Sequence, residues 1–156
     1  MARQIIKSGQ IGENRKARFE YSIDDTIEAG VSLLGAEVKS LRYGMVNLSD
    51  GFVSVKNRNL YLKNVAIMPL PTANKVINFD ERRARILLLH QNQINRLVGK
   101  LEEKGATVFP LKLYFNRRGL VKVLLGIGFG KTRTDKRKTI RAREWDREKS
   151  RVLRRG

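Results

Sequence analysis

The chain offers few side chains suited to covalent or metal chemistry. It contains no cysteine and a single histidine, His90. Without cysteine the chain has no disulfide, no thiol nucleophile and no Cys-ligated zinc or iron–sulfur cluster. One histidine leaves little for a histidine-based metal site or proton relay, and its place before a predicted helix suggests a helix-start residue. We therefore expect no resident metal and no cofactor.

Three carboxylates stand close together in the sequence, at Asp24, Asp25 and Glu28. Such a cluster could hold a divalent metal for nuclease chemistry, but no second acidic cluster or histidine accompanies it. An exposed acidic turn between two strands is the simpler interpretation. A metal-dependent nuclease stays open as the enzymatic alternative.

A glycine-rich segment at residues 126–132 (GIGFGKT) resembles a phosphate-binding loop. The Walker pattern requires glycine where this chain has Leu125, and the dinucleotide pattern requires its third glycine where this chain has Lys131. The segment therefore predicts a flexible exit from the last strand. The sequence favours a protein that is not an enzyme.

The strongest compositional signal is basic charge. The chain of 156 residues has 33 Lys and Arg against 15 Asp and Glu, a net charge of +18, which indicates a polyanionic partner. Aromatic rings that can stack on bases are interleaved with cations that can neutralise phosphates, although each ring could instead pack in the core. These residues are Tyr43, Tyr61, Phe79, Tyr114 and Phe115 with Lys39, Arg42, Lys63, Lys112 and Arg117. The pattern favours shape-based RNA binding.

The charge divides the chain into a body and a tail. Residues 1–18 carry +4, residues 19–130 carry +6 and residues 131–156 carry +8. The last segment has twelve basic residues and few large apolar ones, so it cannot build a core alone. We predict a domain at 1–130 and a basic tail at 131–156. No apolar run approaches the ~18–20 residues of a membrane span and no signal peptide is visible, which predicts a soluble cytoplasmic protein without membrane contact.

The periodicity predicts short elements that could position these residues. Strands are expected at 19–23 and 26–34, followed by a helix at 35–42 that ends at Gly44. A hairpin at 52–55 and 60–62 is extended by 65–70, and 72–85 is expected to be a polar loop. A helix at 94–101 ends at Gly105, and a second hairpin joins 107–115 to 120–127. This content predicts a mainly β fold with short helices, arranged as a small barrel.

Several segments in this order resemble the SsrA-binding protein (small protein B) family. The resemblance runs from about residue 14 to 153 and rests on residues 14–18 (NRKAR), Tyr21, 28–30 (EAG), 35–42 (GAEVKSLR), 47–50 (NLSD), 87–89 (LLL), 110–115 (PLKLYF) and the GK and DKR of 130–137. It implies an oligonucleotide-binding-like (OB-like) barrel that binds the tRNA-like domain of transfer-messenger RNA. It further implies an adaptor of trans-translation, a monomer bound once per RNA, which carries this RNA to stalled ribosomes.

The resemblance also assigns residues to two RNA interfaces. It places Asn14, Glu28 and Leu88 on the RNA-binding surface of the barrel, and the predicted interface also includes Arg15, Lys16, Arg18, Lys39, Arg42 and Asn47. Its implied ribosome-reading tail, disordered alone and helical in the messenger channel near the decoding-centre rRNA, includes Lys131, Asp135, Lys136, Arg137, Trp145 and Val152. Phe19, the segment 79–81 and Thr134 depart from the family pattern. A constitutive basic ribosomal protein is the alternative function.

Overall fold

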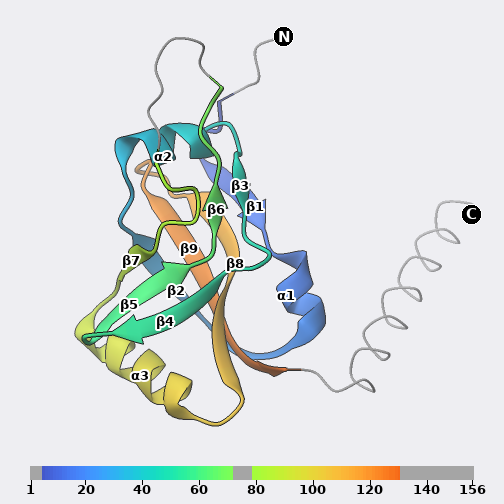
Figure 1. Ribbon diagram of the computed structural model, residues 1–156, viewed down its shortest axis with the longest axis vertical. Coiled ribbons are helices and arrows are strands. Elements are labelled where there is room, and N and C mark those ends of the chain that lie inside the picture. The colour runs from blue at the N-terminus through green and yellow to red at the C-terminus, as the bar shows by residue number, and fades with distance from the viewer. Residues whose placement is uncertain (1–4, 72–78, 131–156) are drawn as a thin grey trace, which may run out of the picture.

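The computed structural model describes residues 5–71 and 79–130, which form a mainly β protein with three helices (Figure 1). Seven strands make one antiparallel sheet in the order β1-β8-β9-β2-β7-β5-β4. Their bounds are β1 Gly9–Glu13, β8 Ala106–Phe115, β9 Val121–Gly130, β2 Tyr21–Val31, β7 Arg85–Leu88, β5 Asn59–Lys63 and β4 Phe52–Lys56. A two-stranded sheet pairs β3 Val46–Asn47 with β6 Ala66–Ile67, and the helices are α1 Arg15–Glu20, α2 Gly35–Leu41 and α3 Gln91–Glu102.

The large sheet curls without closing. Its edge strand β4 packs against β8 but shares no ladder of hydrogen bonds with it. Alternate side chains of β8 and β9 point inward, so Leu113, Phe115, Val123 and Leu125 are buried with the neighbouring strands in one core. The mainly β fold with short helices is confirmed, as an open curled sheet.

The predicted turns and later helices are confirmed. Asn57 and Arg58 connect β4 to β5, and both have positive φ, as a two-residue type I′ hairpin turn requires. Helix α2 is followed by Gly44, and α3 begins after His90 and is followed by Gly105; both glycines have positive φ. His90 therefore has the helix-start position that the sequence predicts.

The predicted strand at 19–23 is wrong in its first half. The Asn14 side chain accepts a hydrogen bond from the Ala17 N–H at 3.1 Å, and this cap starts helix α1, which continues through Phe19 and Glu20. Strand β2 begins only at Tyr21 and runs unbroken to Val31. The expected acidic turn is therefore also wrong, because Asp24 and Asp25 lie inside β2, at a bulge in its pairing with β9.

Two other expectations are corrected. Residues 126–130 are no flexible exit: they belong to β9, and a Cβ added to Gly128 would lie 2.2 Å from the Ser22 carbonyl oxygen, so the close strand approach requires glycine. Residues 65–70 do not extend the first hairpin. The positive φ of Asn64 turns the chain away from β5, and the following β6 pairs with β3.

A buried ion pair joins α2 to β7. The Glu37 carboxylate accepts hydrogen bonds from Arg85 Nε at 2.7 Å and from Arg83 Nη2 at 2.6 Å, and neither Glu37 nor Arg85 has exposed surface. Arg85 also donates to the Val65 carbonyl at 2.8 Å. Since Arg85 opens β7, this network fixes the strand that carries Leu88. The sequence expectation placed Arg85 at the end of a polar loop and missed this strand.

Candidate nucleic-acid interface

The outer face of the large sheet brings chemically different side chains into two rows. Gly30 of β2 pairs with Leu88 of β7 on one side and with Lys122 of β9 on the other, and Lys122 pairs with Tyr114 of β8. The adjacent row runs Lys112, Leu124, Glu28 across the same central strands. We call these residues the outer-face rows. Their neighbours along each strand, such as Ala29 and Leu87, are buried, so the rows face outward.

A shallow groove of about 500 Å³ lies over part of the outer-face rows. Its lining includes Glu28 and Leu88, two residues that the resemblance placed in one interface, together with Lys122 and the start of α3 at His90 and Gln93. Leu88 is 57% exposed, which is unusual for a leucine in the middle of a sheet. Gly30 leaves space at the bottom of the groove, because a Cβ at this position would lie 3.2 Å from the Leu88 Cβ.

Glu28 is held in place by a neighbour. The Tyr114 hydroxyl donates a hydrogen bond to the Glu28 carboxylate, and burial together with this carboxylate raises the pKa of Tyr114. Lys112 Nζ lies 5.6 Å from the centre of the Tyr114 ring. The remaining carboxylate lone pairs can accept from base amino groups or ribose hydroxyls, Leu88 can pack on a base, and the lysines can meet phosphates.

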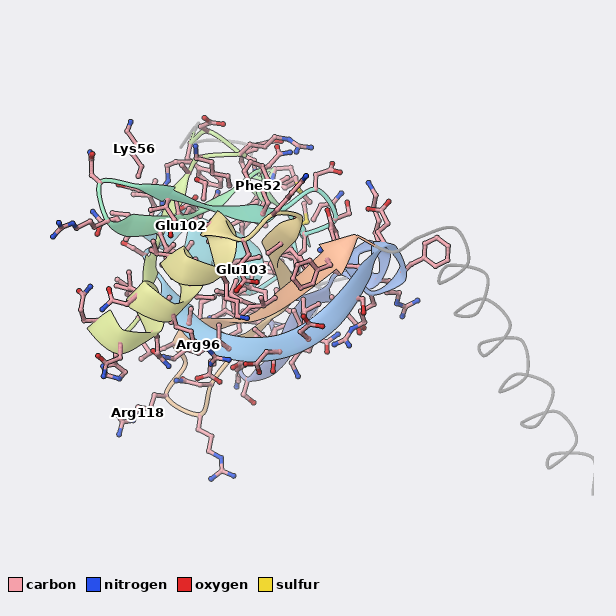
Figure 2. All side chains as sticks on the ribbon, turned by 90° about the horizontal axis from the view of Figure 1, so that it is seen from below. Phe52, Lys56, Arg96, Glu102, Glu103 and Arg118 are labelled. Carbon is pink, nitrogen blue, oxygen red and sulfur yellow. The ribbon has the colours of Figure 1, made fainter. Side chains whose placement is uncertain are left out.

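The outer-face rows continue toward α1. Arg18 Nε lies 3.6 Å from the Glu13 carboxylate and Arg15 Nε lies 4.0 Å from it, and Glu13 pairs with Lys112 in the β1–β8 ladder. Arg15 and Arg18 therefore extend the basic edge of this face. Lys16 leaves it and contacts Asp50 at 3.4 Å. Other cations, including Lys56, Arg96 and Arg118, project from different parts of the surface (Figure 2).

The remaining predicted barrel residues do not lie in the groove. Asn14 is only 2% exposed, and its amide donates to the Leu48 and Pro110 carbonyls at 3.1 and 2.8 Å. Arg42 donates to the Ile6 carbonyl at 3.0 Å and stacks over Phe115. The Asn47 side chain holds the turn at Ser49. Lys39 is exposed on α2.

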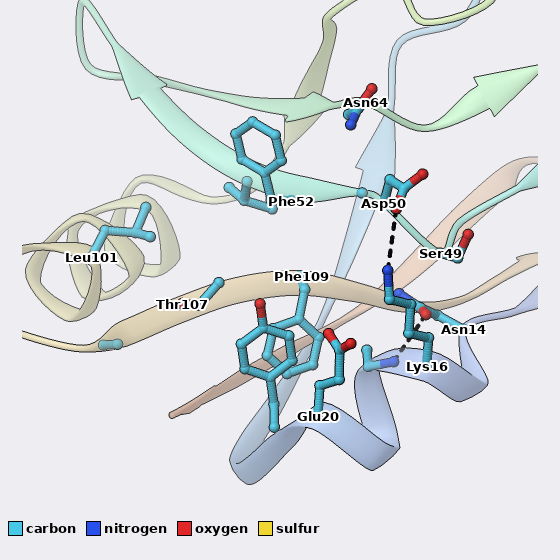
Figure 3. Close-up of a pocket in the computed structure, with 15 residues that line it drawn as sticks. Asn14, Lys16, Glu20, Ser49, Asp50, Phe52, Asn64, Leu101, Thr107 and Phe109 are labelled. Carbon is cyan, nitrogen blue, oxygen red and sulfur yellow. Dashed lines mark hydrogen bonds and ion pairs between the residues drawn. The ribbon is translucent and has the colours of Figure 1, made fainter. Parts of the chain in front are cut away.

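A second pocket, of about 470 Å³, lies between α1, the start of β4 and the end of α3 (Figure 3). Its apolar wall includes Phe109, which stacks on Tyr21 with ring centres 4.5 Å apart, and Leu101. Phe52 lines it too and is 40% exposed. Glu20 also lines this space, and among residues 5–71 and 79–130 it has no ion-pair partner.

The structure gives no support to a nuclease built on the β2 carboxylates. Asp25 forms an ion pair with Arg96, and Glu28 accepts from Tyr114. Within the described part of the chain, no three His, Asp or Glu side chains are grouped closely enough to hold a metal ion. None of the helices described there is long and apolar enough to span a membrane.

Sequence reasoning did not assign Lys122 or Leu124 to the interface. Tyr114 and Lys112 were noticed only as members of a general aromatic and basic pattern. The missing signal is register: period-2 alternation places each residue on one face of its own strand, but the pairing of β9 with both β2 and β8 is a long-range property. The predicted tail residues, from Lys131 to Val152, lie outside the described residues.

Comparisons with known proteins agree on one family. The family model described as "SmpB protein" matches residues 11–155. An SsrA-binding protein of Afipia carboxidovorans is 50% identical over 144 residues, 92% of this chain and 91% of the relative, and one of Rhodospirillum rubrum is 46% identical over 150 residues, 96% and 94%. A solved structure described as "tmRNA-SmpB: a journey to the center of the bacterial ribosome" matches with a TM-score of 0.67 and 47% identity, covering 83% of this chain and 94% of that one.

Proposed function

The chain belongs to the SmpB protein family, and from that premise we propose that it is an RNA-binding adaptor of trans-translation. The outer-face rows bind the tRNA-like domain of transfer-messenger RNA, and the protein accompanies this RNA to stalled ribosomes in the cytoplasm. Residues 131–156 read the empty messenger channel. The relatives are named SsrA-binding proteins, and the matched structure is described by the words "tmRNA-SmpB" and "bacterial ribosome".

One observation carries the assignment of the interface to the outer face. The β2 pairing with β7 and β9 places an exposed leucine, a lysine and a tyrosine-held carboxylate beside one another, at Leu88, Lys122 and Glu28. A surface that only needed solubility would gain nothing from an exposed leucine, whereas an unstacked base needs an apolar face, a hydrogen-bond acceptor and a nearby cation.

The buried position of Asn14 gives it a different part in this interface. Its side chain joins the start of α1 to the β8 carbonyl of Pro110 and the loop carbonyl of Leu48. We assign it the role of holding α1 so that Arg15 and Arg18 border the outer-face rows. Asn14 then affects RNA binding through α1 and makes no contact of its own.

Substitutions in the groove test the barrel interface. Glu28→Ala and Leu88→Asp should each lower the affinity for the isolated tRNA-like domain by about tenfold or more, since each removes a contact worth about 1–3 kcal/mol or buries a charge against a base. Binding is measured by fluorescence anisotropy at fixed salt, with folding checked by circular dichroism. Val55→Asp, on another exposed apolar side chain, is the matched control. Unchanged affinity in both groove variants would move the interface elsewhere.

Truncation tests the tail. Removing residues 131–156 should leave affinity for the tRNA-like domain nearly unchanged and abolish peptide tagging on stalled ribosomes in a reconstituted translation system. The same outcome in milder form is expected when Asp135, Lys136 and Arg137 are all changed to Ala. Loss of RNA binding on truncation would contradict the division of labour between body and tail.

A further inference from the structure

We infer that His90 contacts a phosphate of the bound RNA as a protonated imidazole, so that RNA binding at the groove takes up a proton. The inference rests on the proposed function, because it needs RNA at the outer-face rows. His90 is the only histidine of the chain, and neither the outer-face rows nor the predicted interface includes it.

His90 borders the groove from a fixed position. It follows Leu88 by two residues, its side chain is exposed, and it lines the groove together with Glu28 and Lys122. The His90 N–H donates to the Gln93 side chain at 3.2 Å, and the His90 carbonyl accepts from the Gln93 and Ile94 N–H groups, each at 3.0 Å. These bonds hold the backbone of His90, so the ring starts from a defined point at the end of the groove.

The imidazole ring itself is not used by the fold. Helix α3 has no hydrogen bond from a side-chain cap, because the Gln93 N–H donates to the His90 carbonyl. Among residues 5–71 and 79–130, none of the ion pairs includes the ring. The first charged residue of α3 is Arg96, which is paired with Asp25 of β2. Both ring nitrogens are therefore available to a ligand.

Charges of both signs face the ring from the sheet. In the groove these are Glu28 from β2 and Lys122 from β9, and the other residues that line it are uncharged. Strand β8, against which α3 packs, adds Lys112 and Tyr114 to the same outer face, and the Tyr114 hydroxyl is bonded to Glu28. The lysines oppose a positive charge on the ring and Glu28 supports it. The negative charge that a phosphate adds to this group favours the protonated ring.

A nucleotide on the outer-face rows brings its backbone to this position. Leu88 offers the apolar surface for the base and Glu28 the hydrogen-bond acceptor, so the sugar and the phosphate lie at the edges of the groove. Lys122 occupies one edge, across Gly30 from Leu88, and His90 occupies its end. Lysine is charged at neutral pH, whereas an imidazole changes its charge between about pH 5 and 8. Phosphate binding and proton binding at His90 therefore strengthen each other by the same factor.

The single histidine makes a direct test possible. In untagged full-length protein with ¹³C-labelled histidine, one imidazole resonance reports His90, and its chemical shift is followed from pH 5.5 to 8.5. The titration is run without RNA and with a saturating amount of the isolated tRNA-like domain. We expect RNA to move the midpoint to higher pH by about half to one unit. The affinity, measured at constant ionic strength, should then rise about three- to tenfold from pH 8 to pH 6, where carboxylates and lysines with ordinary pKa values do not titrate.

Two substitutions separate a protonated phosphate contact from a stacking contact. His90→Asn keeps a favourable helix cap and removes the ionisable ring, so the affinity should lose its pH dependence. His90→Phe keeps an aromatic face, and it should bind about three- to tenfold more weakly than wild type at pH 6. Asn92→Ala, on an exposed side chain of the same helix turn, is the control and should keep the wild-type pH dependence. Circular dichroism confirms that each variant is folded.

Three results would overturn the inference alone: an unmoved His90 midpoint, a wild-type pH dependence in His90→Asn, or wild-type affinity of His90→Phe at pH 6. The last result would mean that the ring stacks on a base. In each case Leu88→Asp would still weaken binding, and the proposed interface would stand. RNA that binds Leu88→Asp and Glu28→Ala as tightly as wild type would instead reject the interface, and this inference with it.

Discussion

At the scale of single residues, the protein uses carboxylates to set the positions of cations and rings. Glu28 is held by Tyr114 on the outer face, and Glu37 is held by two arginines in the interior. The two sites differ in solvent exposure. Glu28 is exposed and can exchange partners with a ligand, whereas Glu37 has no exposed surface. The first carboxylate is therefore available for recognition and the second serves stability.

Tyr114→Phe tests whether Tyr114 acts through Glu28. Loss of the hydroxyl frees the carboxylate to rotate, and we expect RNA affinity to fall by about three- to thirtyfold, in the range of one hydrogen bond to a charged group. In a Glu28→Ala background the same change should cost almost nothing more. Tyr61→Phe, on β5, is the control. Fully additive losses in the double variant would show that Tyr114 contacts RNA on its own account.

Glu37→Ala should be among the most destabilising single changes in the chain. It leaves Arg85 buried without its carboxylate, and breaking a buried pair in this way typically costs about 3–5 kcal/mol. Urea unfolding monitored by circular dichroism measures the loss. Glu81→Ala, on an exposed carboxylate near the start of the same segment, should stay within about 0.5 kcal/mol of wild type. Comparable small losses in both would mean that the interior pair adds little.

The same pair predicts a response to acid. Burial alone would raise the pKa of Glu37, but hydrogen bonds from Arg83, the Leu34 N–H and Arg85 outweigh it and hold that pKa below 4.5. The folded protein then releases this proton more readily than the unfolded chain. The stabilisation is complete above about pH 4.5 and is lost as the pH falls through the folded pKa. The difference in the free energy of unfolding between wild type and Glu37→Gln should therefore become smaller when urea titrations are run at pH values from 6 down to 3. A constant difference would contradict this.

At the scale of elements, sequence patterns predicted the helices and strands that are specified by residues close together in the chain. The β4–β5 hairpin, α2 and α3 are encoded by turn residues and by helical spacing within a dozen residues, and the structure confirms them. Helix α1 was missed because its cap depends on Asn14, whose amide is fixed by carbonyls 34 and 96 residues away. Strand β7 was missed because its first residue is an arginine. Arg85 can be buried at the start of a strand only because the Glu37 carboxylate compensates its charge. Because β7 carries Leu88, the position of Leu88 beside β2 in the interface could not be predicted either.

Strand β9 provides a matched pair of glycines for a test at this scale. A methyl group at Gly128 would meet the Ser22 carbonyl, whereas one at Gly130 meets nothing within 4 Å. Gly128→Ala should lower the thermal unfolding temperature and cost about 1–3 kcal/mol, as overpacking does. Gly130→Ala should be close to neutral, within about 0.5 kcal/mol. Equal behaviour of the two variants would argue against the close approach of β2 and β9.

At the scale of the whole molecule, the net charge of +18 overstates the charge available to any one partner. Residues 1–130 carry +10 of it, and some of their cations are matched internally, such as Arg85 by Glu37 and Arg96 by Asp25. The outer-face rows contribute two lysines and a carboxylate. The salt dependence of RNA binding should therefore reflect a few residues of the body.

The contribution of the lysines of the outer-face rows to this salt dependence can be measured. Replacing Lys112 and Lys122 together by Met should reduce the slope of log affinity against log salt by about 1 per lysine. Glu28→Gln should weaken binding without lowering the slope. Lys56→Met, on an exposed lysine of the β4 hairpin, is the control for charge alone. An unchanged slope in the double lysine variant would mean that phosphates are met elsewhere.

The strand order has a consequence for how the protein is made. Strand β2 is complete once residue 31 has been synthesised, but its long partner β9 begins only at Val121, and β7 begins at Arg85. Until Arg85 is reached β2 therefore has neither of these partner strands, and an unpaired strand is free to pair with other chains. Asp24, Asp25 and Glu28 place three negative charges along it during that time. We expect these charges to disfavour pairing of β2 with other chains before the sheet forms.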